Sequence, residues 1–147
     1  MNILFVCTGN TCRSPMAEGY LKELIQKSDR NDIAVLSAGL MAGPGQKASL
    51  HSFEILKVQG IDISEHQSRQ VIPDFLKASD LVLTMTESQK MMLTHQFPEE
   101  SEKIKTLAEF AELEGEIVDP FGGDRFQYEK AAHEIRVRVE KSWEKIK

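Results

Sequence analysis

Cys7 and Arg13, near the start of the chain, are the residues best suited to carry out chemistry. Five residues separate them, in the stretch Cys-Thr-Gly-Asn-Thr-Cys-Arg-Ser that runs from position 7 to position 14. A cysteine thiolate is a strong nucleophile, and a guanidinium presents a planar fork of donors that fits a phosphate group. The pair predicts a covalent reaction at an anionic centre, with Cys7 as the attacking group and Arg13 as the anion-binding group.

The segments on either side of this stretch predict that it is a loop between a strand and a helix. The apolar run Ile3–Val6 is typical of a buried strand, and Pro15 suits the first position of a helix. Backbone N–H groups converge in such a loop, and the N-terminus of the helix adds positive potential. We therefore expect the Cys7 thiol to lose its proton easily.

Strands and helices alternate along the rest of the chain. Further strands are predicted at 33–36, 81–85 and 104–107, and helices at 14–27, 46–59, 73–78, 87–97 and 128–146. The apolar residues of the last segment recur every three or four positions, which is typical of a helix packed on a core. This alternation predicts an α/β fold in which helices cover both faces of a parallel sheet. Ligands bind beyond the carboxyl ends of strands in such sheets, and Cys7 falls at that place.

The composition excludes several classes of protein. A chain of 147 residues, with 41% hydrophobic and 28% charged residues, suits one domain spanning 1–147. The net charge of −5 argues against binding to nucleic acid, and no apolar run is long enough to span a membrane. No signal peptide fits, and both cysteines lie in the loop, so we expect a reducing, cytoplasmic setting. Histidines 51, 95 and 133 lack metal-ligand spacing and are expected on the surface, so neither a metal nor another cofactor is predicted.

The loop, the pair Asp119-Pro120 and the segment Ser37-Ala38-Gly39 together resemble the low-molecular-weight protein-tyrosine-phosphatase family. The family signature is Cys, five residues, Arg, and then Ser or Thr, with an Asp-Pro pair near the C-terminus. The resemblance spans essentially the whole chain. It implies a three-layer α/β fold with a central four-stranded parallel sheet (order 2-1-3-4) flanked by helices. It also implies a metal-independent phosphatase that acts on phosphorylated proteins through a phosphocysteine intermediate and releases phosphate ion.

Three residues carry the expected catalysis. Cys7 is the nucleophile, and Arg13 binds the transferred phosphoryl group, whose negative charge spreads over its oxygens in the transition state. Asp119 is the general acid, which protonates the leaving atom and then takes a proton from the attacking water. Without the resemblance, Asp119 and the proline after it would be interpreted as an ordinary turn.

The residues around Cys7 are expected to bind the substrate or to support the loop. The substrate-binding set is Thr8, Gly9, Asn10, Thr11, Cys12, Ser14 and Phe121. Gly9 allows close approach of the backbone to phosphate and unusual dihedral angles. Asn10 tolerates left-handed angles and braces the loop, unless it is an ordinary turn residue. Ser14 donates its hydroxyl to the Cys7 thiolate, caps the helix, or does both.

Two further residues take a role from the resemblance. Cys12 forms a reversible disulfide with Cys7 and so protects the nucleophile from further oxidation, unless it is only a small buried residue. His66 matches a family histidine that hydrogen-bonds the loop asparagine, which here is Asn10. His66 therefore supports the loop and is assigned no catalytic role.

Thr11 and Phe121 indicate the substrate. Family members that act on phosphotyrosine usually carry Ile or Leu in place of Thr11, and Tyr or Trp in place of Phe121. A threonine offers a smaller wall and a hydroxyl acceptor for the N–H donors of a phosphorylated guanidinium, and Phe121 stacks on that flat group. Thr11 is typical of the protein-arginine-phosphatase branch of the family, so the sequence predicts hydrolysis of phosphoarginine in proteins.

Three alternatives stay open. The first is a low-molecular-weight protein-tyrosine-phosphatase with tolerated variation in its pocket. The second is an arsenate reductase, but the thioredoxin-linked type needs further cysteines downstream, and this chain has only Cys7 and Cys12. The third is a non-catalytic phosphate-binding module, which would lack either the nucleophile or the acid.

Overall fold

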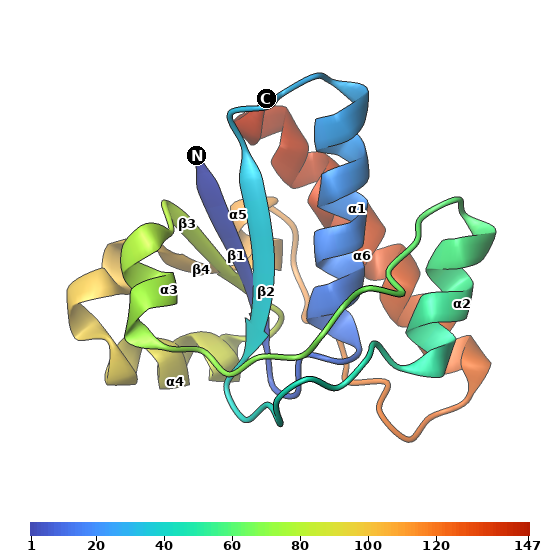
Figure 1. Ribbon diagram of the computed structural model, residues 1–147. Helices are drawn as coiled ribbons and strands as arrows, with labels where there is room; N and C mark the ends of the chain where they lie inside the picture. The colour runs from blue at the N-terminus through green and yellow to red at the C-terminus, as the bar shows by residue number, and fades with distance from the viewer.

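A four-stranded parallel sheet forms the centre of the molecule, which a computed structural model describes for residues 1–147 (Figure 1). The strands are β1 (Asn2–Cys7), β2 (Ala34–Gly39), β3 (Leu81–Thr84) and β4 (Ile104–Thr106). Their order is β2-β1-β3-β4, and every pairing is parallel. The fold class that the sequence predicted and the strand order that the resemblance implied are confirmed.

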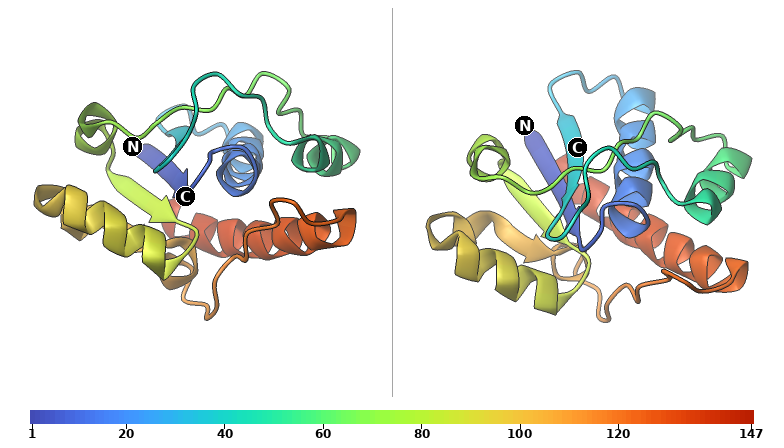
Figure 2. Two further views of the ribbon diagram at one scale, coloured as in Figure 1. Left: turned by 90° about the horizontal axis from the view of Figure 1, so that it is seen from below. Right: turned by 60° about the horizontal axis from the view of Figure 1, so that its bottom comes forward.

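Helices cover both faces of this sheet (Figures 1 and 2). They are α1 (Arg13–Lys27), α2 (Leu50–Val58), α3 (Pro73–Ala78), α4 (Glu87–Gln96), the 3-10 helix η1 (Pro98–Lys103), α5 (Leu107–Phe110) and α6 (Arg125–Ile146). α1 and α6 lie on one face, with α2 packed against both, and α3 and α4 lie on the other face. None of these helices is both long and apolar enough to cross a membrane.

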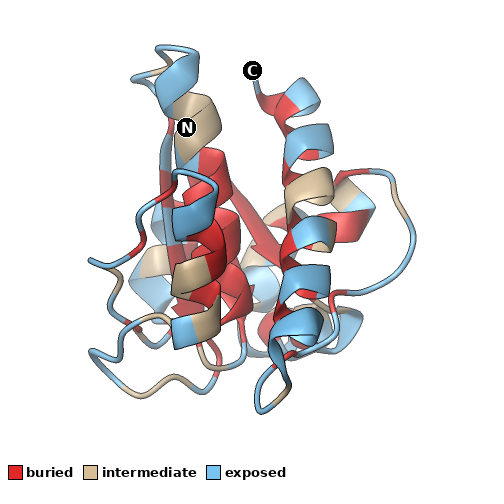
Figure 3. Cartoon of the chain, turned by 90° about the vertical axis from the view of Figure 1, so that its right-hand side faces the viewer, coloured by how far each residue is buried: buried red, intermediate tan, exposed pale blue.

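The two faces of β1 contact two separate cores. Ile3, Phe5 and Cys7 belong to the larger core, which α1, α2 and α6 cover. Leu4 and Val6 belong to the smaller core, beneath α3 and α4. A strand that is buried on both faces has a continuous apolar sequence, which is why β1 was recognisable. In α6 the buried residues form a stripe, and the other residues are exposed or only partly buried, as its amphipathic spacing predicted (Figure 3).

The starts of α1, α2 and α6 differ from the sequence prediction, and α6 begins at Arg125, three residues early. Pro15 is the third residue of α1 rather than the first, because the helix already begins directly after the loop. α2 begins at Leu50 rather than at residue 46. The reason is that Ser49 caps α2 with its side chain and donates its own N–H to the Thr11 carbonyl, at 2.8 Å. The helices η1 and α5 are further elements that the sequence did not indicate.

The carboxyl ends of β1 and β2 lie side by side, where a ligand site was expected. Cys7 pairs with Gly39 at the last position of both strands. A Cβ atom at position 39 would lie 2.6 Å from the Thr8 carbonyl oxygen and 3.1 Å from the Asn10 Cβ. Because that approach is closer than real Cβ atoms allow, glycine lets β2 end against the loop that follows β1.

Candidate active site

Residues 8–12 form a tight loop between β1 and α1, and its backbone carbonyls bond outward. The Cys7 and Thr8 carbonyls accept the N–H groups of the two residues that follow β2, both at 2.9 Å, and the Thr11 carbonyl accepts that of Ser49. Four N–H groups of the loop have no acceptor in the protein: those of Thr8, Gly9, Thr11 and Cys12. A loop with its carbonyls bonded outward and its N–H groups unused is suited to bind an anion.

Asn10 holds the shape of the loop from inside. Its φ is 59°, in the left-handed region, and the residue is fully buried. Its Oδ1 accepts the Arg69 N–H at 2.9 Å, which orients the amide so that Nδ2 donates to Ser14 at 2.8 Å and to Ser37 at 3.0 Å. The left-handed angles are thus at Asn10, and the φ of Gly9 lies outside the left-handed region.

The Cys7 thiol lies at the base of the loop and is 2% exposed. Ser14 Oγ is 2.8 Å from its sulfur, and the Asn10 N–H donates to the sulfur at 3.3 Å. Because Ser14 Oγ already accepts a hydrogen from Asn10, its own hydrogen is free to point at the sulfur. The contact expected between Ser14 and Cys7 is therefore present. The capping role is not, because no side chain caps α1.

Burial and the surrounding donors act in opposite directions on the pKa of the Cys7 thiol. Burial raises the pKa of the Cys7 thiol above its usual value. The Ser14 hydroxyl, the charge of Arg13 and the Asn10 N–H lower that pKa, but by less than burial raises it. The ionisation of the thiol therefore depends on the donors that surround the sulfur.

Arg13 joins the loop to the distant segment that carries Asp119. Its Nη1 donates to the Ile117 carbonyl at 2.9 Å, and its Nη2 lies 3.6 Å from Asp119 Oδ2. Asp119 is half-exposed, and its Oδ1 accepts the Phe121 N–H at 3.0 Å. Arg13 is buried, so it fixes a carboxyl group beside the loop while its other N–H groups stay available to an anion. The sequence did not indicate this bridging contact.

Thr8, Thr11 and Phe121 lie at the surface of the site. Thr8 is exposed, and its Oγ1 accepts from the buried Gln89 side chain at 3.1 Å. Thr11 is partly exposed, and its hydroxyl contacts only Cys12 Sγ, at 3.8 Å. Phe121 is 78% exposed. The loop therefore presents a free hydroxyl, and the Asp119 segment presents a flat apolar ring.

Cys12 is buried between the loop and α6. Its sulfur is 3.4 Å from the Tyr128 hydroxyl. Burial and the neighbouring Cys12 raise the pKa of Tyr128 to about 12, so that this hydroxyl keeps its proton at neutral pH. Both Cys7 and Cys12 are free thiols. His51, which the sequence placed on the surface, is only partly exposed: it packs on Tyr128 with ring centroids 4.9 Å apart, and its Nδ1 is buried.

His66 contacts the outer side of the loop. Its Nε2 is 2.7 Å from the Asn10 carbonyl oxygen, so the expected hydrogen bond is present. Burial lowers the pKa of His66, which favours the neutral ring. Sequence reasoning noted Ser37 only as part of the resemblance and gave Glu18 no role, yet the Ser37 hydroxyl donates to Glu18 at 2.6 Å behind Asn10. The signal that could have found them is a polar residue on the buried face of an apolar strand and helix.

Comparison with known proteins agrees with this geometry. Residues 2–147 match the model of one family, described as low molecular weight phosphotyrosine protein phosphatase. The chain belongs to this family. It is therefore a hydrolase of the low-molecular-weight phosphatases, as the resemblance of its loop and its Asp-Pro pair predicted.

Its relatives bear names that refer to two substrates. The protein-arginine-phosphatase of Geobacillus stearothermophilus is 39% identical over 145 residues, covering 98% of this chain and 95% of that protein. A structure of the arginine phosphatase YwlE with a phosphorylated active-site serine has a TM-score of 0.94 at 35% identity, covering 99% of this chain and 95% of that one. The low molecular weight protein tyrosine phosphatase from T. tengcongensis has a TM-score of 0.93 at 45% identity, covering 99% of both chains. Family membership therefore does not identify the substrate, which depends on the residues of the pocket.

Proposed function

We propose that this protein hydrolyses phosphoarginine in proteins through a phosphocysteine formed on Cys7. The observation that carries the proposal is the loop itself, with its carbonyls bonded outward around Cys7 and four N–H groups left as donors. The Cys7 sulfur attacks phosphorus in line with the leaving nitrogen, so that the S–P bond forms as the P–N bond breaks. Arg13 and the loop N–H groups bind the equatorial oxygens, where the negative charge lies.

Asp119 handles the proton in both steps of this mechanism. In the first step its carboxyl group gives a proton to the leaving guanidinium nitrogen. In the second step the carboxylate takes a proton from water, whose oxygen attacks phosphorus and displaces the Cys7 sulfur. The products are phosphate ion and the free arginine side chain of the substrate protein. The contact with Arg13 holds the Asp119 carboxyl group beside the loop, and its half-exposed side chain is open to the leaving group.

Thr11 selects the substrate in this proposal. Its hydroxyl has no close partner in the protein, so it is available to accept an N–H of the phosphorylated guanidinium. Phe121 is exposed on the Asp119 segment, where it can stack on the flat guanidinium. An isoleucine at position 11 would remove the acceptor and fill the space with methyl groups, which suits a phenyl ring.

The test compares turnover of phosphoarginine and phosphotyrosine proteins. Wild type should prefer phosphoarginine, and Cys7→Ser should turn over neither. A substrate N–H left without a partner costs about 1–3 kcal/mol, so Thr11→Ile should lose about 5- to 150-fold in phosphoarginine kcat/KM. It should keep or gain phosphotyrosine activity. Thr11→Val keeps the shape of the side chain and lacks the hydroxyl, so it distinguishes the effect of the lost acceptor from the effect of a larger side chain.

The ratio of the two activities decides the outcome. A ratio that Thr11→Ile leaves unchanged would show that Thr11 is not the selector. A wild type that prefers phosphotyrosine would overturn the substrate and leave the phosphocysteine mechanism standing.

Hydrolysis of phosphotyrosine is the second candidate function. The solved structure at 45% identity is that of a tyrosine phosphatase, and the exposed ring of Phe121 can also pack on a phenol. The same loop and the same acid would serve this reaction, with a phenol oxygen as the leaving atom. The wild-type preference in the assay above distinguishes the two candidates.

Reversible oxidation of the two cysteines is a further part of the proposal. A peroxide would oxidise the Cys7 thiolate to a sulfenic acid, and the Cys12 thiol would then displace water to form the Cys7–Cys12 disulfide. The loop holds both thiols, and no other cysteine is present in the chain. Reduction by a small thiol would restore the nucleophile.

A further inference from the structure

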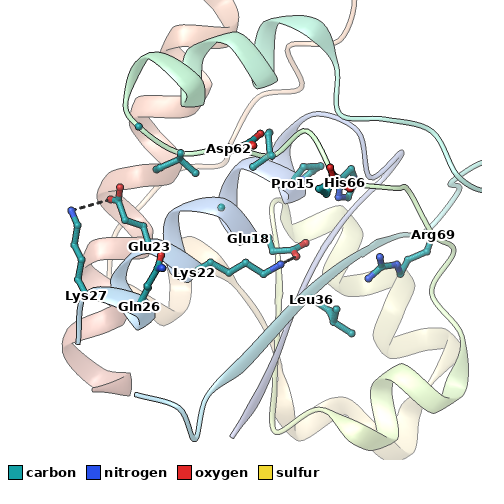
Figure 4. A pocket seen from close by; sticks show the side chains of 15 residues that line it. Pro15, Glu18, Lys22, Glu23, Gln26, Lys27, Leu36, Asp62, His66 and Arg69 are labelled. Atoms are coloured by element: carbon teal, nitrogen blue, oxygen red, sulfur yellow. Dashed lines mark ion pairs between the residues drawn. The ribbon is translucent and has the colours of Figure 1, made fainter. Parts of the chain in front are cut away.

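A cavity of about 740 Å³ lies beside the catalytic loop, between α1, the edge strand β2 and residues 60–69 (Figure 4). It is lined by neither Cys7, Arg13 nor Asp119, so the reaction proposed above does not use it. Its volume is that of a typical small-molecule site. Most of the side chains that line it are polar or charged, which favours a polar ligand.

Residues that line this cavity also hold Asn10. The Arg69 N–H donates to Asn10 Oδ1 at 2.9 Å, and His66 Nε2 contacts the Asn10 carbonyl at 2.7 Å. Glu18 accepts from Ser37, whose Oγ in turn accepts from Asn10 Nδ2. Asn10 has the left-handed backbone that shapes the loop. The cavity is therefore joined to the back of the loop by three independent contacts.

The cationic side chains of the cavity differ in whether they have a partner. Lys22 pairs with Glu18, and Lys27 pairs with Glu23. Arg69 is the third cation, and it forms no ion pair or side-chain hydrogen bond in the protein. Figure 4 shows its guanidinium directed into the cavity, toward the Glu18–Lys22 pair. The guanidinium of Arg69 is thus available to an anionic group of a ligand.

Unpaired carboxylates line the same cavity. Asp62 accepts the backbone N–H of Ser64 at 2.8 Å, and neither Asp62 nor Glu65 forms an ion pair. The Leu36 side chain is 44% exposed and adds an apolar surface on β2. A ligand of a single sign would meet repulsion from one of the two sets of unpaired charges, whereas a dipolar ligand satisfies both.

We propose that this cavity binds a small dipolar molecule with a carboxylate and a separate cationic group, of which a basic amino acid is the simplest example. Arg69 binds the carboxylate, Asp62 and Glu65 bind the cationic group, and the aliphatic chain between the two charges crosses the cavity. A ligand bound in the cavity affects the catalytic loop, because the residues that line the cavity hydrogen-bond to Asn10.

The experiment is a titration of the 15N-labelled full chain with L-arginine, followed by NMR. The Asn10 side-chain amide is buried, so its resonance reports on the loop. We expect saturable shifts at Arg69, at His66 and at the Asn10 side chain. Arg69→Ala removes the guanidinium and keeps the backbone N–H that holds Asn10, and it should weaken binding about tenfold or more. Lys77→Ala, which removes an exposed cation outside the cavity, is the matched control and should bind as wild type.

Two further titrations separate this site from the catalytic loop and test the ligand chemistry. Saturating inorganic phosphate fills the loop and should leave L-arginine binding in place. L-arginine methyl ester, which lacks the carboxylate, should bind at least tenfold more weakly. Shifts that disappear with phosphate, or binding that Arg69→Ala leaves unchanged, would overturn the site. Saturable shifts in the cavity without any at Asn10 would overturn the connection to the loop. All these readouts are independent of which phosphorylated residue the enzyme hydrolyses.

Discussion

Replacing Ser14 by alanine tests how the buried nucleophile is ionised. Ser14 is fully buried, its Oγ lies 2.8 Å from the Cys7 sulfur, and it accepts a hydrogen from Asn10. Burial raises the pKa of the Cys7 thiol, and the hydrogen bond from Ser14 is the largest effect that lowers it. Ser14→Ala removes that bond, so the pKa of the thiol should rise further and the thiolate should become scarcer.

The magnitude follows from the energy of the bond. A hydrogen bond to a charged group contributes about 1.5–3 kcal/mol, and a decade in an equilibrium is about 1.4 kcal/mol. The thiolate-to-thiol ratio at Cys7 should therefore fall about 10- to 150-fold. The thiolate is the nucleophilic form of Cys7, so kcat/KM should show the full decrease at any pH below the wild-type pKa of the thiol. The decrease should become smaller as the pH rises through the higher pKa of the variant.

The assay is the pH dependence of kcat/KM for para-nitrophenyl phosphate, which reports on the free enzyme. Alkylation of Cys7 by iodoacetamide, located by mass spectrometry, gives the thiolate fraction without a substrate. Ser142→Ala is the matched control, because Ser142 is a buried serine whose hydroxyl has no partner. It should leave both profiles unchanged. A Ser14→Ala profile that superposes on the wild-type profile would refute the reasoning, as would an equal loss at every pH.

Three further predictions concern the acid, the second cysteine and the glycine behind the loop. Asp119→Asn should slow turnover by about 10²–10⁴ on substrates with poor leaving groups and less on good ones; equal losses on both would mean that Asp119 only shapes the site. Cys12→Ser should be inactivated irreversibly by mild peroxide faster than wild type, whereas wild type should form a Cys7–Cys12 disulfide that thiols reverse; equal rates of irreversible loss would contradict the protective role. Gly39→Ala should lower the free energy of unfolding by about 1–3 kcal/mol and reduce kcat/KM, because the new Cβ meets the Thr8 carbonyl; denaturant unfolding and turnover measure both.

The sequence by itself determined the fold and the place of the site. The run Ile3–Val6 is typical of a buried strand, and Cys7 ends that strand at the carboxyl edge of the sheet. The periodicity of α6 fixed its buried stripe, since a helix places every third or fourth residue on one side. The residue types from Cys7 to Ser14 indicated an anion site, because thiol, glycine and guanidinium suit phosphate at close range.

Only the tertiary structure decided how these residues act on one another. The start of α2, the left-handed backbone at Asn10 and the raised pKa of Cys7 depend on contacts between segments far apart in the chain. The contact between Arg13 and Asp119 also depends on the folded chain, since more than a hundred residues separate the two in sequence. The hydrogen bond from Arg13 to the Ile117 carbonyl holds the Asp119 segment beside the loop. Local patterns determine which backbone conformation a segment favours. Burial and long-range hydrogen bonds, which determine whether a group is charged and what it can reach, exist only once the chain has folded.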